Sequence, residues 1–159
     1  MAAATIRRAR PSDAAAIARM ANALNRHEAL SPRAFTAPIV RRDAFGPRRA
    51  FRVLVAEAAG RVVGYASFVT GYNTDIAARE LWMLDLFVGP RWRGRGVGRA
   101  LVRAVARQAT RHRFTCLEWG VRDSNRRAIR FYRALGAHIG HARIVSLRGR
   151  ALAAVATGR

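Results

Sequence analysis

The chain has 159 residues and a formal net charge of +21 at pH 7, because 30 basic residues stand against nine acidic ones. Hydrophobic residues make up 51% of it, which is enough for one continuous core, so residues 1–159 are expected to form a single domain. No run of about 18 uncharged apolar residues occurs, and the Ala-rich start has no apolar stretch, which argues against a membrane span and a secretory signal. A cytoplasmic protein is therefore expected.

The basic residues are all Arg, and they are spread along the whole chain rather than gathered in one tail. This spread argues against specific nucleic-acid binding and predicts salt-sensitive adherence to polyanions. Cys116 is the single cysteine, so an internal disulfide is impossible. The four histidines lack the spacing of a metal site, and no metal is expected.

In chain order, residues 5–8 are predicted to form a short strand. A helix follows, because apolar residues recur at helical spacing between residues 17 and 24. A polar stretch with three prolines comes next. The apolar runs 51–57 and 62–70, separated by an Ala-Gly turn, then predict a β-hairpin.

A third apolar run, 81–88, leads through a glycine-rich turn into a second long helix. Another strand is predicted at 114–121, followed by a helix at 128–135 that Gly136 ends. Residues 138–155 are predicted to form a closing strand pair. The order of elements predicts an α/β or α+β fold, with a sheet covered by helices on both faces.

The glycine-rich turn, residues 93–98, has the sequence Arg-Gly-Arg-Gly-Val-Gly. Main-chain N–H groups at a helix start have no intrahelical partner and the helix dipole is positive there, so such a turn binds anions. Arg91, Arg93, Arg95 and Arg99 add charge that suits a ligand with several phosphates. The alternative is a tight connection that needs glycine only for steric reasons. The dinucleotide-binding and P-loop fingerprints are both absent.

The order Arg-x-x-Gly-x-Gly, a further strand, Asn125, and Phe131-Tyr132 followed by Gly136 resembles the GNAT superfamily of acetyl-CoA-dependent N-acetyltransferases. Within that superfamily the chain is most similar to the diamine (spermidine/spermine) acetyltransferases. The resemblance implies acetyl-CoA as co-substrate, a small-molecule amine as acceptor and a homodimer. It also implies a mixed, mostly antiparallel, twisted sheet of six to seven strands with helices on both faces.

The resemblance further implies roles for individual residues. Asn125 would hydrogen-bond near the thioester, and Tyr132 would be the general acid that protonates the departing CoA thiolate. The alternative for Tyr132 is an aromatic residue of the core. One strand edge would lie along the pantetheine arm, and the glycine-rich turn would hold the diphosphate. The residues of these two segments are Leu86, Phe87, Val88, Arg93, Gly94, Arg95, Gly96, Val97, Gly98 and Arg99.

Attack on a thioester needs a neutral amine, so a base or a water path must take a proton from the alkylammonium. In the diamine enzymes a glutamate acts through water at the position of Leu84, so the family base is missing here. By the resemblance, Asp85 matches the aspartate that follows this glutamate, and it is the best remaining candidate for steering or deprotonating the amine. Strand alternation points these neighbours to opposite faces unless a bulge intervenes. The alternative for Asp85 is a solvated or Arg-paired carboxylate. Glu28, which matches an acidic family position, and Glu118, which matches a histidine, are candidates for the acceptor pocket or halves of surface ion pairs.

Three functions follow from these observations. Acetylation of a small-molecule amine is the first, and the scarcity of acidic residues favours an amine smaller than spermine. Acetylation of a protein amino terminus or lysine is the second. The third, in which Leu84 marks a lost base, is non-catalytic binding of acyl-CoA or nucleic acid.

Overall fold

The computed structural model describes residues 3–28, 35–141 and 145–158. By internal contacts the chain forms two compact units, residues 1–120 and residues 121–159, and each is described by itself. The first unit holds the sheet, and the second holds helices. A single domain over the whole chain stays a prediction.

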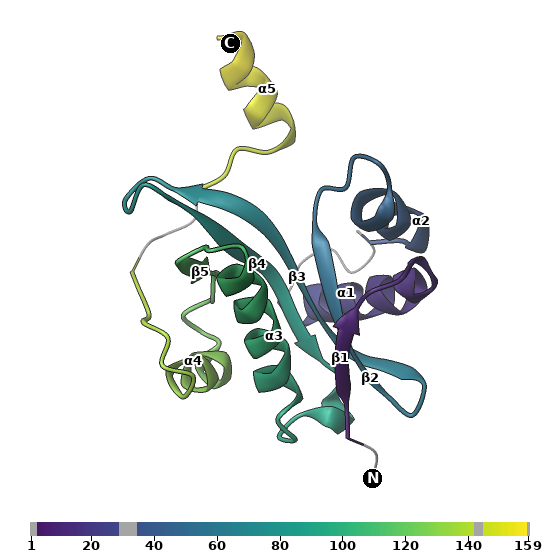
Figure 1. Ribbon diagram of the computed structural model, residues 1–159. Coiled ribbons are helices and arrows are strands. Elements are labelled where there is room, and N and C mark those ends of the chain that lie inside the picture. Colours follow the sequence, from purple (N-terminus) through teal and green to yellow (C-terminus); the bar gives the residue numbers. More distant parts are fainter. Residues whose placement is uncertain (1–2, 29–34, 142–144, 159) are drawn as a thin grey trace. The chain divides into compact units, whose positions relative to one another are not determined.

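The sheet lies in the first unit and has five strands in the described part of the chain, in the order β1-β2-β3-β4-β5 (Figure 1). Neighbouring strands are antiparallel except for β4 and β5, which are parallel. The fold is thus mixed α/β with a mostly antiparallel sheet, as predicted, but it has fewer than the expected six to seven strands. The strands are β1 (Thr5–Arg8), β2 (Arg52–Ala58), β3 (Arg61–Asn73), β4 (Ala78–Val88) and β5 (Cys116–Glu118).

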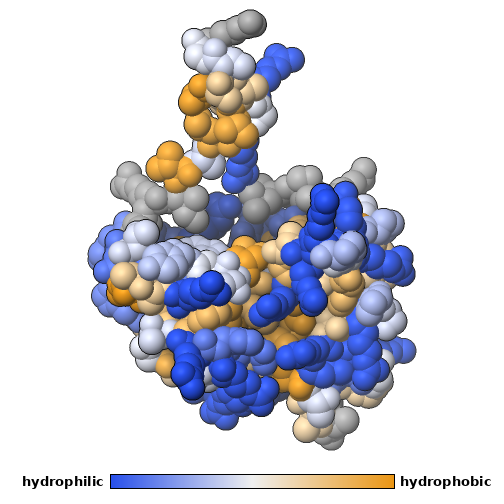
Figure 2. Space-filling view, turned by 45° about the horizontal axis from the view of Figure 1, so that its top comes forward, coloured by the Kyte–Doolittle hydropathy of each residue, from blue (hydrophilic) through white to orange (hydrophobic). Residues whose placement is uncertain are grey.

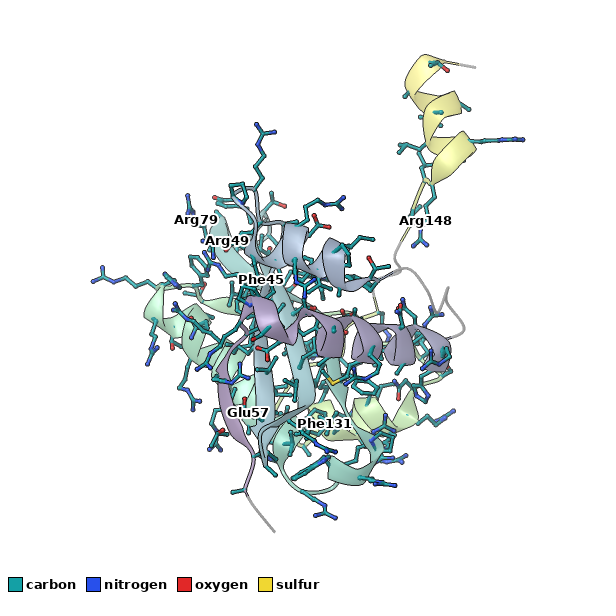
Figure 3. All side chains as sticks on the ribbon, turned by 90° about the vertical axis from the view of Figure 1, so that its right-hand side faces the viewer. Phe45, Arg49, Glu57, Arg79, Phe131 and Arg148 are labelled. Atoms are coloured by element: carbon teal, nitrogen blue, oxygen red, sulfur yellow. The ribbon has the colours of Figure 1, made fainter. Side chains whose placement is uncertain are left out.

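Helices cover both faces of this sheet, as predicted (Figure 1). On one face lie α1 (Ala14–His27), α2 (Ala37–Val40) and the π-helical turn η2 (Arg41–Phe45), and on the other lies α3 (Val97–Arg111). The α1 face packs a core of buried residues against the sheet, and Phe45 packs against that core (Figure 3). Its buried members are Ala14, Ile17, Ala18, Met20, Ala21, Val40, Ala44, Val53, Val55, Tyr65 and Phe87.

Arg7 ties the start of the chain to the hairpin. Its guanidinium donates to Asp13 Oδ2 (2.7 Å), in the turn η1 (Pro11–Asp13), and also forms an ion pair with Glu57 on β2. Arg7 lowers the pKa of Asp13, chiefly through the hydrogen bond. Other arginines, such as Arg49 and Arg79, are exposed (Figure 3). Figure 2 shows hydrophilic side chains spread over the face turned to the viewer, with hydrophobic ones between them.

The second unit corrects the prediction for the end of the chain. It contains α4 (Arg126–Arg133) and α5 (Gly149–Thr157), so the strand pair expected at 138–155 is wrong where the structure describes it, and residues 142–144 lie outside the described residues. The physical reason is composition, because α5 is rich in Ala, the strongest helix former, and lacks the alternation of a strand. Missing this pair explains the lower strand count.

Among the described residues, none of the helices has the length and apolar character needed to cross a membrane.

Candidate functional site

A cavity of about 160 Å³ opens between α1 and the sheet in the first unit. Its walls are mainly apolar, and they carry one carboxylate and two hydroxyl groups. The lining residues are Ile17, Ala21, Phe35, Phe51, Tyr65, Ser67, Leu84 and Asp85. A small apolar cavity with a single charged group is typical of a binding site for a small organic molecule.

A bulge in β4 brings Leu84 and Asp85 to this cavity together. Ser67 of β3 pairs with Asp85 and Phe68 pairs with Met83, which leaves Leu84 without a partner in β3. The extra residue interrupts the alternation of the strand, so two consecutive side chains reach the same cavity. As the sequence indicated, a bulge is required for positions 84 and 85 to face the same way, and β4 has that bulge.

The Asp85 carboxylate is held by two hydroxyl groups on β3. Tyr65 Oη donates to Asp85 Oδ2 at 3.0 Å, and Ser67 Oγ donates to the same oxygen at 3.2 Å. Burial raises the pKa of Asp85, and the two hydrogen bonds oppose that rise only in part. Burial, with the Asp85 charge second, also raises the pKa of Tyr65, so its hydroxyl stays protonated. A carboxylate with a raised pKa is a stronger base than an exposed one, which suits proton removal.

Neither Glu28 nor Glu118 is among the described residues that line the cavity. Glu28 directly follows α1, and its charge makes the smallest contribution to the raised pKa of Tyr65. Glu118 lies on β5 beside Trp82 of β4, where Asn73 Nδ2 donates to its Oε1 at 3.1 Å. Their predicted roles in acceptor binding stay predictions.

Glu118 belongs to a cluster with Glu80 and Cys116, whose possible ligand atoms lie within 4.8 Å of one another. Asn73 donates to both carboxylates, and Cys116 Sγ donates to Glu118 Oε1 at 3.5 Å. Burial, followed by the hydrogen bond to Glu118, raises the pKa of Cys116 to about 11. The Cys116 thiol is therefore protonated near pH 7. The absence of a metal stays a prediction.

Two of the three glycines in the glycine-rich turn have a backbone conformation that favours glycine, whereas Gly98 lies within α3. Gly94 and Gly96 have φ values of +73° and +77°, a conformation that side chains disfavour. A Cβ atom built on either glycine meets nothing within 4 Å, so the space in front of the turn is open. Gly96 caps α3 without a side-chain bond, and the first bond of the helix runs from Ala100 N to Gly96 O. The amides of Val97 and Gly98, which begin the helix, therefore lack intrahelical acceptors.

The arginines of this turn are placed differently from one another. Arg93 Nε donates to the carbonyl of Val88 at 2.9 Å, and its guanidinium lies 5.7 Å from the ring centroid of Phe87. The guanidinium of Arg95 lies 5.8 Å from the ring of Trp92. Arg91 and Arg99 are exposed. Arg93 thus joins the turn to the end of β4 as well as adding charge.

One edge of β4 is largely open. Among the described residues, β4 pairs with β5 only from Glu80 to Trp82, so the main chain from 83 to 88 has no strand partner on that side. This open part includes Leu86, Phe87 and Val88, which the resemblance assigns to the pantetheine arm. It leads directly to the glycine-rich turn through η3 (Pro90–Trp92).

Asn125 and Tyr132 belong to the second unit. Asn125 Oδ1 accepts a bond from Ala128 N at 3.1 Å and thereby caps α4. Tyr132 is buried, with its ring centroid 5.2 Å from that of Phe131. Their predicted roles at the thioester stay predictions.

Sequence reasoning missed the groups that complete the cavity. Tyr65 and Ser67, whose hydroxyl groups bond to Asp85, are two residues apart in a strand and so lie on the same face. Hydroxyl groups in an otherwise apolar strand are the one feature of the sequence that could have indicated a polar site there. Phe35 belongs to no hydrophobic or turn pattern in the sequence, so nothing there pointed to it as a cavity residue. These residues meet only through the register of β3 and β4 and the packing of α1.

Comparison with known proteins gives one consistent result. A sequence profile of the Acetyltransferase (GNAT) family matches residues 18–137. Thialysine N-epsilon-acetyltransferase of Mus musculus is 35% identical over 146 residues, which cover 86% of this chain and 85% of the mouse protein. L-ornithine N5-acetyltransferase of Arabidopsis thaliana is 35% identical over 95 residues, covering 59% of this chain and 42% of the plant protein.

Solved structures agree on the fold. An integron cassette protein from the mobile metagenome of V. cholerae has a TM-score of 0.80 at 23% identity, covering 96% of this chain and 97% of that one. An aminoglycoside acetyltransferase from a soil metagenome has a TM-score of 0.74 at 16% identity, covering 92% and 97%. At these identities the likeness concerns the fold alone.

Proposed function

Because the chain belongs to the acetyltransferase (GNAT) family and is an enzyme that acetylates amines, we propose that it transfers acetyl from acetyl-CoA to a small-molecule primary amine. The observation that carries this proposal is the partly buried Asp85 that lines a small apolar cavity. Thialysine and ornithine, named for two relatives, both carry an amino group on a short chain, and such an amine fits a cavity of about 160 Å³.

In this mechanism Asp85 removes the proton from the incoming ammonium group. An alkylammonium has a pKa of about 10, so near pH 7 it reaches the site protonated and must lose a proton before attack. The raised pKa of Asp85 brings the base closer to working pH, and Tyr65 and Ser67 fix the carboxylate through Oδ2. The neutral amine nitrogen would then attack the thioester carbonyl and form the C–N bond. As the C–S bond breaks, the nitrogen would lose its second proton and the departing sulfur would gain one, so that the products are the neutral amide and free CoA.

Acetyl-CoA binding is assigned to the glycine-rich turn and the open edge of β4. Main-chain N–H groups at the start of α3 would donate hydrogen bonds to the diphosphate, with Gly94 and Gly96 leaving room for it. The edge of β4 at Leu86, Phe87 and Val88 has no strand partner among the described residues, so its outward main-chain groups, except the Val88 carbonyl that Arg93 occupies, would be available to the amide-bearing pantetheine arm. The two segments adjoin in the chain, as one extended ligand requires.

Tyr132 is proposed as the general acid that protonates the departing thiolate, and Asn125 as a hydrogen-bonding group near the thioester. Support comes from the matching motif, in which Tyr132 follows Phe131 on the helix that Asn125 caps. A phenol with its ordinary pKa near 10 can donate a proton to a thiolate as the C–S bond breaks.

A homodimer is proposed from the same resemblance. The exposed apolar side chains of α5 support it, since Leu152 is 54% and Val155 64% exposed, and hydrophobic residues colour this helix in Figure 2. A nine-residue helix with no buried residue gains little stability by itself. A monomeric mass in solution would contradict the dimer. The cytoplasmic location stays a prediction.

The test of the proposed function is thiol release. The protein is incubated with acetyl-CoA and a panel of amines that includes thialysine, ornithine, spermidine and an aminoglycoside, together with peptides that carry a free amino terminus or lysine. We expect CoA release with the short-chain amines and acetylated products by mass spectrometry. Better turnover of the peptides would favour protein acetylation, and background release with every acceptor would overturn catalysis.

A further inference from the structure

One side chain on α1 holds the segment that supplies Phe35 to the cavity. Asn22 Nδ2 donates to the main-chain carbonyl of Phe35 at 2.7 Å, and the Phe35 N–H donates to Asn22 Oδ1 at 3.1 Å. Both main-chain polar groups of Phe35 are therefore satisfied by one amide group. Asn22 itself is not among the residues that line the cavity.

The position of Phe35 matters because its ring forms part of an aromatic wall. It packs edge-on against Phe51, with ring centroids 6.5 Å apart and planes at 79°. Both rings line the cavity, where they stand with Ile17, Ala21 and Leu84. Phe35 precedes α2 and lies in no helix or strand, so no regular backbone bonding holds it. The amide of Asn22 takes the place of such bonding.

We propose that Asn22 is a positioning residue for the acceptor, which acts through Phe35 to keep one wall of the cavity in place. This proposal rests on the proposed function, because it takes the cavity to be the acceptor site. Only an amide supplies both a donor and an acceptor in this geometry. Aspartate lacks the donor, and leucine, of similar size, lacks both groups.

The same wall defines the class of acceptor. Five of the eight lining residues are apolar, and the one charged group is Asp85. A carboxylate carried beside the amine would enter an apolar space next to a like charge, which is unfavourable. The acceptor is therefore a primary amine whose neighbouring chain is uncharged, such as a short alkyl or thioether chain, with any further charged group farther away.

The experiment measures steady-state kinetics of the Asn22→Leu variant with unbranched alkylamines of three to six carbons. We expect the amine KM to rise about tenfold, in line with the loss of two hydrogen bonds, while kcat changes less than about twofold. The KM for acetyl-CoA should stay unchanged. Arg19→Leu, at an exposed position of the same helix, is the matched control and should leave all three constants unchanged.

A double-mutant cycle separates positioning from general support of the fold. Phe35→Ala should raise the amine KM by itself, and adding Asn22→Leu should then raise it little further, because the ring that Asn22 positions is gone. Full additivity would overturn the proposal. If Asn22→Leu does not fold, Asn22→Asp, which keeps the acceptor for the Phe35 N–H, should give a smaller rise, and an unchanged KM there would overturn it equally.

A specificity measurement completes the test. Propylamine should have a kcat/KM at least about tenfold above that of 3-aminopropanoate, which adds a carboxylate to a similar chain. Equal use of the two would contradict the uncharged-chain requirement. No turnover by the wild-type protein with any amine would overturn the proposed function itself, whereas normal turnover with an unaffected Asn22→Leu variant would overturn only the positioning role.

Discussion

Tyr65 and Asp85 lie diagonally across the β3–β4 pair, and the Tyr65 hydroxyl donates a 3.0 Å hydrogen bond to Asp85 Oδ2. Burial raises the pKa of both groups, so the pair contains a neutral phenol and a carboxylate that binds a proton more tightly than usual. The bond fixes the carboxylate within an apolar cavity.

Asp85→Asn should lower kcat by about 10²-fold or more, because the amide cannot accept the ammonium proton. The KM for acetyl-CoA should stay within about twofold, since the cofactor segments are unchanged. Stopped-flow or steady-state thiol release measures both constants. A variant with wild-type kcat would remove Asp85 from the chemistry.

The same substitution should raise the thermal midpoint at pH 7. The folded state binds the Asp85 proton more tightly than the unfolded chain does, so its contribution to stability is present at low pH and is lost as pH rises through the raised pKa. Asparagine carries no charge and avoids that loss, and its carbonyl can still accept from Tyr65 and Ser67. Calorimetry at pH 4 and pH 7 should show the gain mainly at pH 7.

Tyr65→Phe should move the acid side of the pH profile upward. The hydrogen bond from Tyr65 is the larger of the two influences that lower the pKa of Asp85, so its loss lets burial raise that pKa further. In a plot of log kcat/KM against pH, the slope changes at the pH where Asp85 becomes protonated, which lies above the ordinary aspartate pKa of 3.8. In the Tyr65→Phe variant this change of slope should shift to higher pH. Ser67→Ala should shift it the same way by less, and a downward shift would contradict the assignment.

Tyr132→Phe should lower kcat by about 10²-fold while acetyl-CoA affinity, measured by calorimetry, stays nearly unchanged. The ring and its packing against Phe131 are kept, and the substitution removes the hydroxyl group that would donate the proton. Equal turnover in the variant would leave Tyr132 as an aromatic residue of the core.

Gly96→Ala should weaken acetyl-CoA binding about tenfold or more, because the added methyl group occupies the open space where the diphosphate would approach. Its φ of +77° also makes alanine unfavourable by about 1 kcal/mol. Gly60→Ala is the matched control, since Gly60 has a φ of +70° with equally open surroundings in the β2–β3 turn. Both variants should lose similar stability, and only Gly96→Ala should lose affinity; a matching loss in Gly60→Ala would refute the cradle.

Arg7→Met should destabilise the fold by about 1–2 kcal/mol at pH 7, because it removes charge-assisted bonds to a largely buried Asp13. The lowered pKa of Asp13 means that this stability is present above the ordinary pKa and is lost as pH falls through the lowered one. The free energy of unfolding of the variant, measured by urea titration, should therefore fall less steeply as the pH is lowered. Arg42→Met, which breaks the exposed pair with Asp43, should leave the midpoint unchanged.

The sequence predicted well where local pattern decides structure. Helical spacing between 17 and 24 located α1, and the two apolar runs around the turn at Gly60 located β2 and β3. Pattern failed in the proline-containing stretch, where α2 and η2 form. Thr36 caps α2 there and Pro38 lies in its first turn, the one part of a helix that tolerates proline. In the sequence this stretch is recognisable only as polar and proline-containing, and no helix was predicted there.

The site could be predicted in part. Gly94 and Gly96 made the turn recognisable in the sequence, because their positive φ values favour glycine over any other residue. Asp85 was identified as a candidate base, but the direction of its side chain depends on the bulge at Leu84, which the sequence does not reveal. Tyr65 and Phe35 approach Asp85 only in the folded chain, since strand register and the amide of Asn22 bring them there.

The unpaired position in β4 has a consequence for how the acceptor preference of this enzyme can vary. Leu84 has no partner across the strand and its side chain is 47% exposed, so replacing it disturbs neither a cross-strand pair nor the core. A single codon change at this position therefore alters the chemistry of the cavity while Asp85 keeps its place. Deleting Leu84 would instead restore regular alternation along β4. The side chains before position 84 would then change faces, so that those facing the solvent would face the core and the reverse.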